Sequence, residues 1–323
     1  MFAMHWKNTL SKGVELDISI IVPVYNNEQT LERLLVDLDL IQKSFLGNLE
    51  VIFVIDGSTD KSLVMLEKQI KVVDFKHKLI QLSRNFGSFE AIRCGMQYAQ
   101  GRFIIVKSAD LQESNQLIQD FYALLDSGDF DIVFGRRASR EDGFVRDKFS
   151  KSYWFIYRKF INSEIPVGGV DIFGCTRNVA NLISQFSEKN SSLLGLLYWI
   201  GFKRGYVDYN REKSLNPKGS WSLSKKIKYA FDSIFSFTGM PIVLIQTIGL
   251  IGILASFTVS IIVIFLRLNG TIIVPGYTAL MIVTLFSMST ILFAVGIVGS
   301  YAWRAFENTK QRPAPIVWKI KDD

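Results

Sequence analysis

The chain has 323 residues, 49% of them hydrophobic, and its 37 lysines and arginines exceed its 30 aspartates and glutamates to give a net charge of +7. This apolar content excludes a disordered chain, and the modest positive charge favours phosphates or lipid headgroups as partners and argues against nucleic acid. Two cysteines without metal-ligand spacing and only two histidines leave carboxylates as the groups for acid–base or metal chemistry.

Short apolar runs rich in Ile, Val and Phe predict strands, and helical patterns lie between them. After an N-terminal extension at 1–17, strands are expected at 18–25, 49–56, 79–83, 103–107 and 130–135, and helices at 30–42, 61–71, 89–100 and 116–127. This alternation predicts an α/β fold with a doubly wound, mostly parallel sheet, in a domain that covers 18–220. Ligands bind such sheets beyond the carboxyl ends of the strands.

Polar residues follow each of these predicted strands. In chain order they read YNNE at 25–28, DGSTD at 56–60, SRNFG at 83–87, SADLQ at 108–112 and GRR at 135–137. Carboxylates, amides and arginines at one sheet edge can hold a divalent cation and the diphosphate that it bridges. Neither a dinucleotide fingerprint nor a P-loop follows the first strand.

Two long uncharged segments lie in the C-terminal third. Residues 233–266 and 268–303 contain no Asp, Glu, Lys or Arg. They predict two transmembrane helices near 242–266 and 278–300, within a region 238–303 that includes a short outer loop, whereas buried core helices are the alternative. Lysines and arginines on both flanks place the domain, both termini and a tail at 304–323 in the cytoplasm.

The segment at 221–237 joins the domain to the first predicted span. Apolar residues recur there at helical spacing, with Lys225, Lys226 and Lys228 on another face. This pattern predicts an interfacial amphipathic helix that lies on anionic membrane lipids. A surface helix packed on the domain is the alternative.

Five motifs, VPVYNNE, FVIDGSTD, LSRNFG, SADLQ and GSYAWRAFENTKQRP, occur in this order between about residues 18 and 317. Together they resemble the polyprenyl-phosphate glycosyltransferases of glycosyltransferase family 2, which include bactoprenyl-phosphate glucosyltransferases and dolichol-phosphate mannose synthases. The resemblance implies a GT-A-type domain that transfers one sugar, with inversion, from a nucleotide-sugar donor to a polyprenyl or dolichyl phosphate. It also implies Mg²⁺ or Mn²⁺ as cofactor, a homo-oligomer, for which a tetramer is suggested, and an integral protein of the bacterial inner membrane.

The resemblance also implies roles for individual residues. The nucleotide-sugar site would contain Pro23, Tyr25, Glu28, Asp56, Ser108 and Asp110, and the cation would be held by Asp110 and Gln112. Catalytic positions would be Asp171, in GGVDIFGCTR, and Arg211, in YNREK, and the acceptor phosphate would meet Arg136, Arg137 and Arg211. Because a phosphate monoester is mostly dianionic at neutral pH, Asp171 either acts as a base or orients the acceptor.

The chain departs from the family pattern at three positions. Ser108 stands where relatives usually carry the first aspartate of Asp-x-Asp, and Ile55 stands where they carry the first of two aspartates. Ser214 stands where a second arginine is common after Arg211. A catalytically weak or inactive lipid-binding scaffold is therefore the alternative function. Asp56, Asp60 and Asp110 also have simpler interpretations as turn or helix-capping residues, and Arg136 and Arg137 as solvated charges. A Ser108→Asp change is expected to tighten cation binding.

Overall fold

The computed structural model describes residues 16–45, 48–137, 165–166, 170–186, 192–210, 276–310 and 315–322, together with positions 247, 251, 258, 261, 265 and 269. Several predictions fall outside these residues. They concern most of the N-terminal extension, the amphipathic helix at 221–237, nearly all of the first predicted span, and Arg211.

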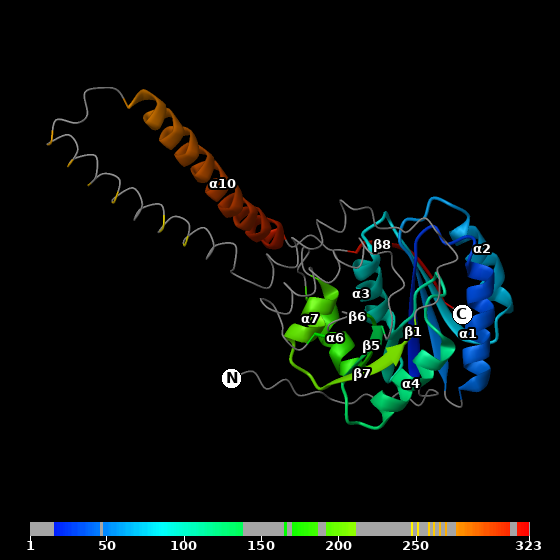
Figure 1. Ribbon diagram of the computed structural model, residues 1–323. Coiled ribbons are helices and arrows are strands. Elements are labelled where there is room, and N and C mark those ends of the chain that lie inside the picture. The colour runs from blue at the N-terminus through cyan, green and yellow to red at the C-terminus, as the bar shows by residue number, and fades with distance from the viewer. Residues whose placement is uncertain are drawn as a thin grey trace.

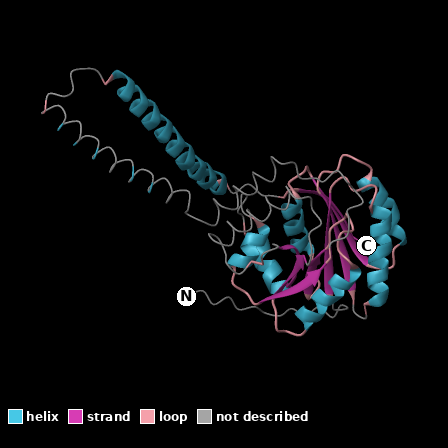
Figure 2. Ribbon diagram, viewed as in Figure 1, coloured by secondary structure: helices cyan, strands magenta, loops and turns pink. Residues whose placement is uncertain are grey.

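Eight strands form one sheet in the order β7-β5-β6-β4-β1-β2-β3-β8 (Figures 1 and 2). Their bounds are β1 Ile18–Val24, β2 Leu49–Ile55, β3 Lys76–Leu82, β4 Phe103–Val106, β5 Ile132–Arg137, β6 Val170–Thr176, β7 Arg204–Tyr209 and β8 Val317–Asp322. The five strands predicted from sequence are all present. Strands β6 and β8 run antiparallel to their neighbours, whereas the other six strands share one direction, so the sheet is mixed and mostly parallel, as predicted.

Helices cover both faces of the sheet (Figure 2). They are α1 Leu31–Ser44, α2 Ser62–Gln69 with the 3-10 turn η1 Ile70–Val72, α3 Ser88–Tyr98, α4 Asn115–Asp126, α6 Arg177–Gln185 and α7 Leu193–Trp199. Gly95 of α3 lies against Ile21 of β1, whereas α4 lies near Ile105 of β4. Ile105 is in register with Ile20, the residue of β1 that precedes Ile21. Successive strand residues point to opposite faces, so α3 and α4 lie on opposite sides of the sheet.

The central strands are apolar on both faces, as expected for a sheet covered on both sides. All seven residues of β2 are buried, and one of them is the carboxylate Glu50. Its Oε1 accepts a hydrogen bond of 2.6 Å from the Ser19 hydroxyl of β1. The same oxygen also accepts from the Gln100 N–H at 2.5 Å, and these hydrogen bonds offset part of the cost of burying the carboxylate.

The C-terminal residues belong to the sheet. Strand β8 pairs antiparallel with β3, and Lys321 lies 2.6 Å from Glu67 of α2. Beside the end of β3, the Ser83 N–H donates to the Ile316 carbonyl at 3.0 Å. The sequence prediction treated 304–323 as a tail, and the structure shows that part of it covers an edge that β3 would otherwise expose.

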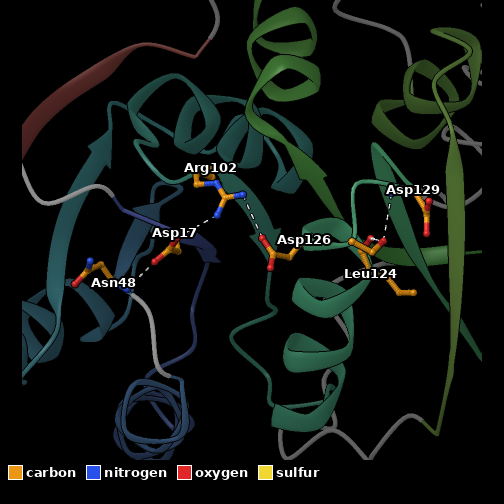
Figure 3. A network of polar contacts seen from close by, with 7 residues as sticks. Asp17, Asn48, Arg102, Leu124, Asp126 and Asp129 are labelled. Carbon is orange, nitrogen blue, oxygen red and sulfur yellow. Dashed lines mark hydrogen bonds and ion pairs between the residues drawn. The ribbon is translucent and has the colours of Figure 1, made fainter. Parts of the chain in front are cut away.

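Ion pairs and a hydrogen bond lie at the edge of the sheet where β1 and β4 begin. Arg102 donates to Asp17 at 3.4 Å and to Asp126, near the end of α4, at 3.2 Å (Figure 3). Asp17 also accepts from the Asn48 N–H at 3.1 Å, just before β2. These contacts join four elements, β1, β2, β4 and α4, on the side away from the strand ends where ligands are expected.

Helix α10, Tyr277–Thr309, extends away from the sheet (Figure 1). It contains the second predicted span, 278–300. Among the residues that the structure describes, no helix meets the length and apolarity needed to cross a membrane. The two transmembrane helices therefore stay a prediction from sequence.

Candidate functional site

The carboxyl ends of β1 to β5 and of β7 lie at one edge of the sheet, because these six strands run in the same direction. Strand β6 runs the other way, so its first residues reach this same edge. Pro23, Asp56, Ser108, Asp110, Arg136 and Asp171 are thereby brought to one side of the domain. The alternation of strands and helices predicted that the residues after the first five strands would share this edge, whereas Asp171 was selected through the family resemblance.

The loops after β1 and β2 are held together by a reciprocal pair of carboxylates. Asp60 accepts from the Glu28 N–H at 3.1 Å, and Glu28 accepts from the Lys61 N–H at 3.0 Å. Asn26, at a φ of 53°, accepts from the Thr59 N–H at 2.8 Å. Glu28, predicted for the nucleotide pocket, thus has a structural role, whereas Tyr25 on the same loop is exposed.

Asp56 holds the loop that follows β3. Its side chain is 2% exposed, and its two oxygens accept from the Phe86 N–H at 2.6 Å and the Gly87 N–H at 2.8 Å. Burial raises the pKa of this carboxyl above its ordinary value, against the opposing effect of the two N–H donors. The predicted turn role of Asp56 is therefore present in this structure, and its predicted contact with the nucleotide stays a prediction.

Gly57 lets the β2 and β3 loops approach each other. It has a φ of +64°, and a Cβ built there would lie 2.4 Å from the Asn85 nitrogen. Gly57→Ala is expected to lower the free energy of unfolding by about 2 kcal/mol or more, through backbone strain and this clash. Gly128→Ala is the control, since Gly128 has a φ of +77° with nothing within 4 Å, and should cost only about 1 kcal/mol. Urea unfolding of both variants measures the difference, and equal losses would show that the contact is unimportant.

The loop after β4 carries the predicted cation ligands. Ser108 and Asp110 are partly buried and Gln112 is buried. Leu111 between them has a φ of 60°, a strained conformation for a residue with a side chain, and such strain is concentrated at functional sites. The Thr30 hydroxyl donates to the Ala109 carbonyl at 2.6 Å, which fixes this loop against the start of α1.

The Ser108 hydroxyl lies between two carboxylates. Its Oγ is 2.7 Å from Asp110 Oδ1, and it also forms a hydrogen bond with Glu113 Oε2. The Ser108 N–H donates to the same Glu113 oxygen at 3.1 Å. Glu113 directly follows the SADLQ motif, and the sequence analysis did not select it. An acidic residue directly after a motif that lacks one of its usual aspartates was the feature of the sequence that could have identified Glu113.

The oxygen donors in this loop suit a hard divalent cation that brings ligands of its own. Asp110, Gln112 and Ser108 offer a carboxylate, an amide and a hydroxyl, all within five residues. The described part of the chain contains no group of three or more His, Cys, Asp or Glu residues that could hold a metal ion. Carboxylate, amide and hydroxyl oxygens are ligand types that hard divalent cations bind.

The predicted acceptor arginines lie at the end of β5. Arg136 forms a bidentate pair with Asp208 of β7, with N–O distances of 2.5 and 2.7 Å. The hydrogen bond from Arg136 lowers the pKa of Asp208 below its ordinary value. Arg136 is thus already paired, while Arg137 is partly buried and in register with Tyr209. Arg211, which follows Asn210, lies outside the described residues.

Asp171 lies at an irregularity of the sheet. The register between β5 and β6 pairs Gly135 with Ile172 and Arg136 with Val170, so Asp171 is an extra residue on β6. Such bulges often occur beside active sites, where they redirect a side chain. The backbone of Asp171 lies next to the strand end that carries Arg136, and its side chain is outside the described residues, so its catalytic role stays a prediction.

Comparisons with known proteins show the family to which the chain belongs. Residues 19–181 match the family model "Glycosyl transferase family 2". The chain is 31% identical to the uncharacterized glycosyltransferase YkcC of Bacillus subtilis over 94% of each chain. It is 26% identical to the prophage bactoprenol glucosyl transferase homolog of Escherichia coli, over 95% of this chain and 100% of that one. It is also 26% identical to the undecaprenyl-phosphate 4-deoxy-4-formamido-L-arabinose transferase of Proteus mirabilis, over 94% and 93%. With the α/β mixed sheet and the polar strand ends described above, these matches show that the chain is a glycosyltransferase and belongs to glycosyl transferase family 2.

Proposed function

We propose that this protein transfers a single sugar from a nucleotide-sugar donor to a polyprenyl phosphate at the cytoplasmic face of the membrane, with inversion at the anomeric carbon. The observation that carries the proposal is the match, over nearly the whole chain, to transferases named for bactoprenol and undecaprenyl phosphate. The convergence of carboxylates and arginines at one sheet edge supports it.

The described residues divide this edge into two regions of different chemistry. On the β1–β4 side, the linked loops around Glu28, Asp56 and Asp110 would bind the nucleoside diphosphate. A divalent cation there would neutralise the charge that develops on the leaving diphosphate. On the β5–β7 side, Arg136 and Arg137 would bind the acceptor phosphate, and Asp171 would orient it against the donor sugar.

The acceptor needs little help to become a nucleophile. A phosphate monoester has a second pKa of about 6, so its oxygen already carries the required charge at neutral pH. For Arg136 to bind it, the phosphate would replace Asp208 as the bidentate partner of the guanidinium. Before the lipid arrives, Asp208 keeps the Arg136 guanidinium paired.

Membrane attachment is part of the proposal. It is supported by the two uncharged segments of the sequence and by the apolar side chains exposed along α10, among them Leu280, Val283, Ile291, Val295 and Val298. Apolar groups exposed at this density are unfavourable in water and favourable in lipid.

The product of the reaction tests the function. Membranes that contain the protein are incubated with a panel of nucleotide sugars and undecaprenyl phosphate, and the mass of the lipid product is measured by mass spectrometry. We expect a mass increase of one sugar unit with one donor, and NMR of the product should show the inverted anomer. A protein that neither consumes any donor nor modifies the lipid would instead support the scaffold alternative.

Orientation in the membrane gives a separate prediction. A cysteine placed at Asn269, between the two predicted spans, is expected to react with an impermeant thiol reagent added to intact cells, whereas a cysteine at Lys321 is not. The native Cys94 and Cys175 are buried and should stay silent. Labelling at position 321 with position 269 unreactive would contradict the proposed orientation.

A further inference from the structure

Ser108 is the position at which this chain departs from the usual metal motif, and Glu113 contacts it twice. Both the N–H and the hydroxyl of Ser108 are directed at Glu113 Oε2. Glu113 is 6% exposed, so these contacts are largely shielded from water. Removing either partner would leave a buried polar group without its hydrogen bond.

The number of hydrogens in this cluster is smaller than the number of acceptors. A serine hydroxyl has one hydrogen, yet its oxygen is within hydrogen-bonding distance of both Asp110 Oδ1, at 2.7 Å, and Glu113 Oε2. If the hydrogen points to Glu113, which the Ser108 N–H also favours, a lone pair of Oγ faces Asp110. Two oxygens then lie in contact with no hydrogen between them, an arrangement that a cation would stabilise.

A buried lysine fixes the loop that carries Glu113. Lys107 has no exposed surface, and its Nζ donates to the Glu113 carbonyl at 3.0 Å and to Asn115 Oδ1 at 3.4 Å. Next to it, Ser114 caps α4 by accepting from the Leu117 N–H. The Glu113 backbone is thus held on both sides, so its carboxylate is a rigid acceptor.

We propose that Glu113 is a positioning residue of the cation site: it takes the hydroxyl hydrogen of Ser108, so that the Ser108 oxygen joins Asp110 as a ligand of the cation that accompanies the nucleotide. Glu113 thereby supplies, through Ser108, part of the negative charge that an aspartate at position 108 would provide. Residues behind metal ligands commonly orient them in this manner. The inference rests on the proposed function, which it deepens.

The binding of Mn²⁺ tests this role on the purified full-length protein. UDP and GDP are tried on the wild type, and Mn²⁺ affinity is then measured by electron paramagnetic resonance with the nucleotide that binds. Glu113→Gln is expected to weaken Mn²⁺ binding about tenfold or more, the usual effect of losing such an orienting group. In the transfer assay the apparent KM for Mn²⁺ should rise while kcat at saturating Mn²⁺ is kept. Glu32→Gln on α1, whose carboxylate accepts from Gln69, is the matched control and should leave both values unchanged.

A double-mutant cycle separates positioning from a general charge effect. Ser108→Ala, which leaves Glu113 and its loop intact, should weaken Mn²⁺ binding to a similar extent. Glu113→Gln added to Ser108→Ala should then have little further effect, because Glu113 acts through the hydroxyl. Wild-type affinity in Glu113→Gln, full additivity of the two changes, or no Mn²⁺ binding by the wild type would each overturn the inference.

Failure of the proposed function looks different. It would appear as wild-type protein that yields no glycosylated lipid, whatever the Mn²⁺ affinities of the variants.

Discussion

Asp110→Asn is expected to reduce sugar transfer by about a hundredfold to a thousandfold. Asp110 is the one carboxylate among the predicted cation ligands, and the amide of asparagine carries no charge to hold a hard divalent ion. Loss of several kcal/mol of stabilisation of the leaving diphosphate corresponds to a rate loss of this size.

The measurement is the rate of lipid glycosylation against Mn²⁺ concentration for wild type and Asp110→Asn. The thermal stability of the variant should stay close to that of wild type, because Asp110 is partly exposed and asparagine has nearly the same size and shape. Full activity in Asp110→Asn, or wild-type activity that is unchanged in excess chelator, would show that the cation role assigned to this loop is wrong.

Asp56→Ala is expected to lower the free energy of unfolding by about 3 kcal/mol. The change leaves the N–H groups of Phe86 and Gly87 without their acceptor and frees the β3 loop from the end of β2. Urea unfolding of the full-length protein measures the loss. Asp74→Ala, at an exposed aspartate before β3, is the control and should change stability by less than about 0.5 kcal/mol.

The pH dependence of stability gives an independent check on Asp56. Because its pKa is raised in the folded protein, the folded state holds this proton more tightly than the unfolded chain. The resulting stability is fully present below the ordinary pKa of about 4 and is lost as the pH rises through the raised value. Relative to Asp56→Asn, which cannot titrate there, wild type should therefore lose stability over this interval. If wild type instead gained stability relative to Asp56→Asn as the pH rises over this interval, the raised pKa of Asp56 would be contradicted.

In the loop after β4, the sequence alone did not show that Glu113 contacts Ser108. The family resemblance selected Ser108 and Asp110, and the missing carboxylate at position 108 predicted tighter cation binding for Ser108→Asp. The structure brings Glu113 against the same position, so an aspartate there would contact a carboxylate that is already buried. We now expect Ser108→Asp alone to destabilise the protein without its cation, and Ser108→Asp with Glu113→Gln to relieve that repulsion.

The sequence alone determined the alternation of strands and helices, the five strands from β1 to β5 and the polar residues at their ends, because burial on both faces demands continuous apolar runs that polar loops interrupt. It could not determine which loops would meet. Three sets of contacts depend on distances of a few ångströms between chain segments. They are the reciprocal hydrogen bonds of Glu28 and Asp60, the hydrogen bonds between Asp56 and the β3 loop, and the contact between Ser108 and Glu113. The bulge at Asp171 and the pairing of β8 with β3 depend on register across strands distant in sequence. Only the tertiary structure decided these, because hydrogen bonds between loops are directional and leave no periodic pattern in the sequence.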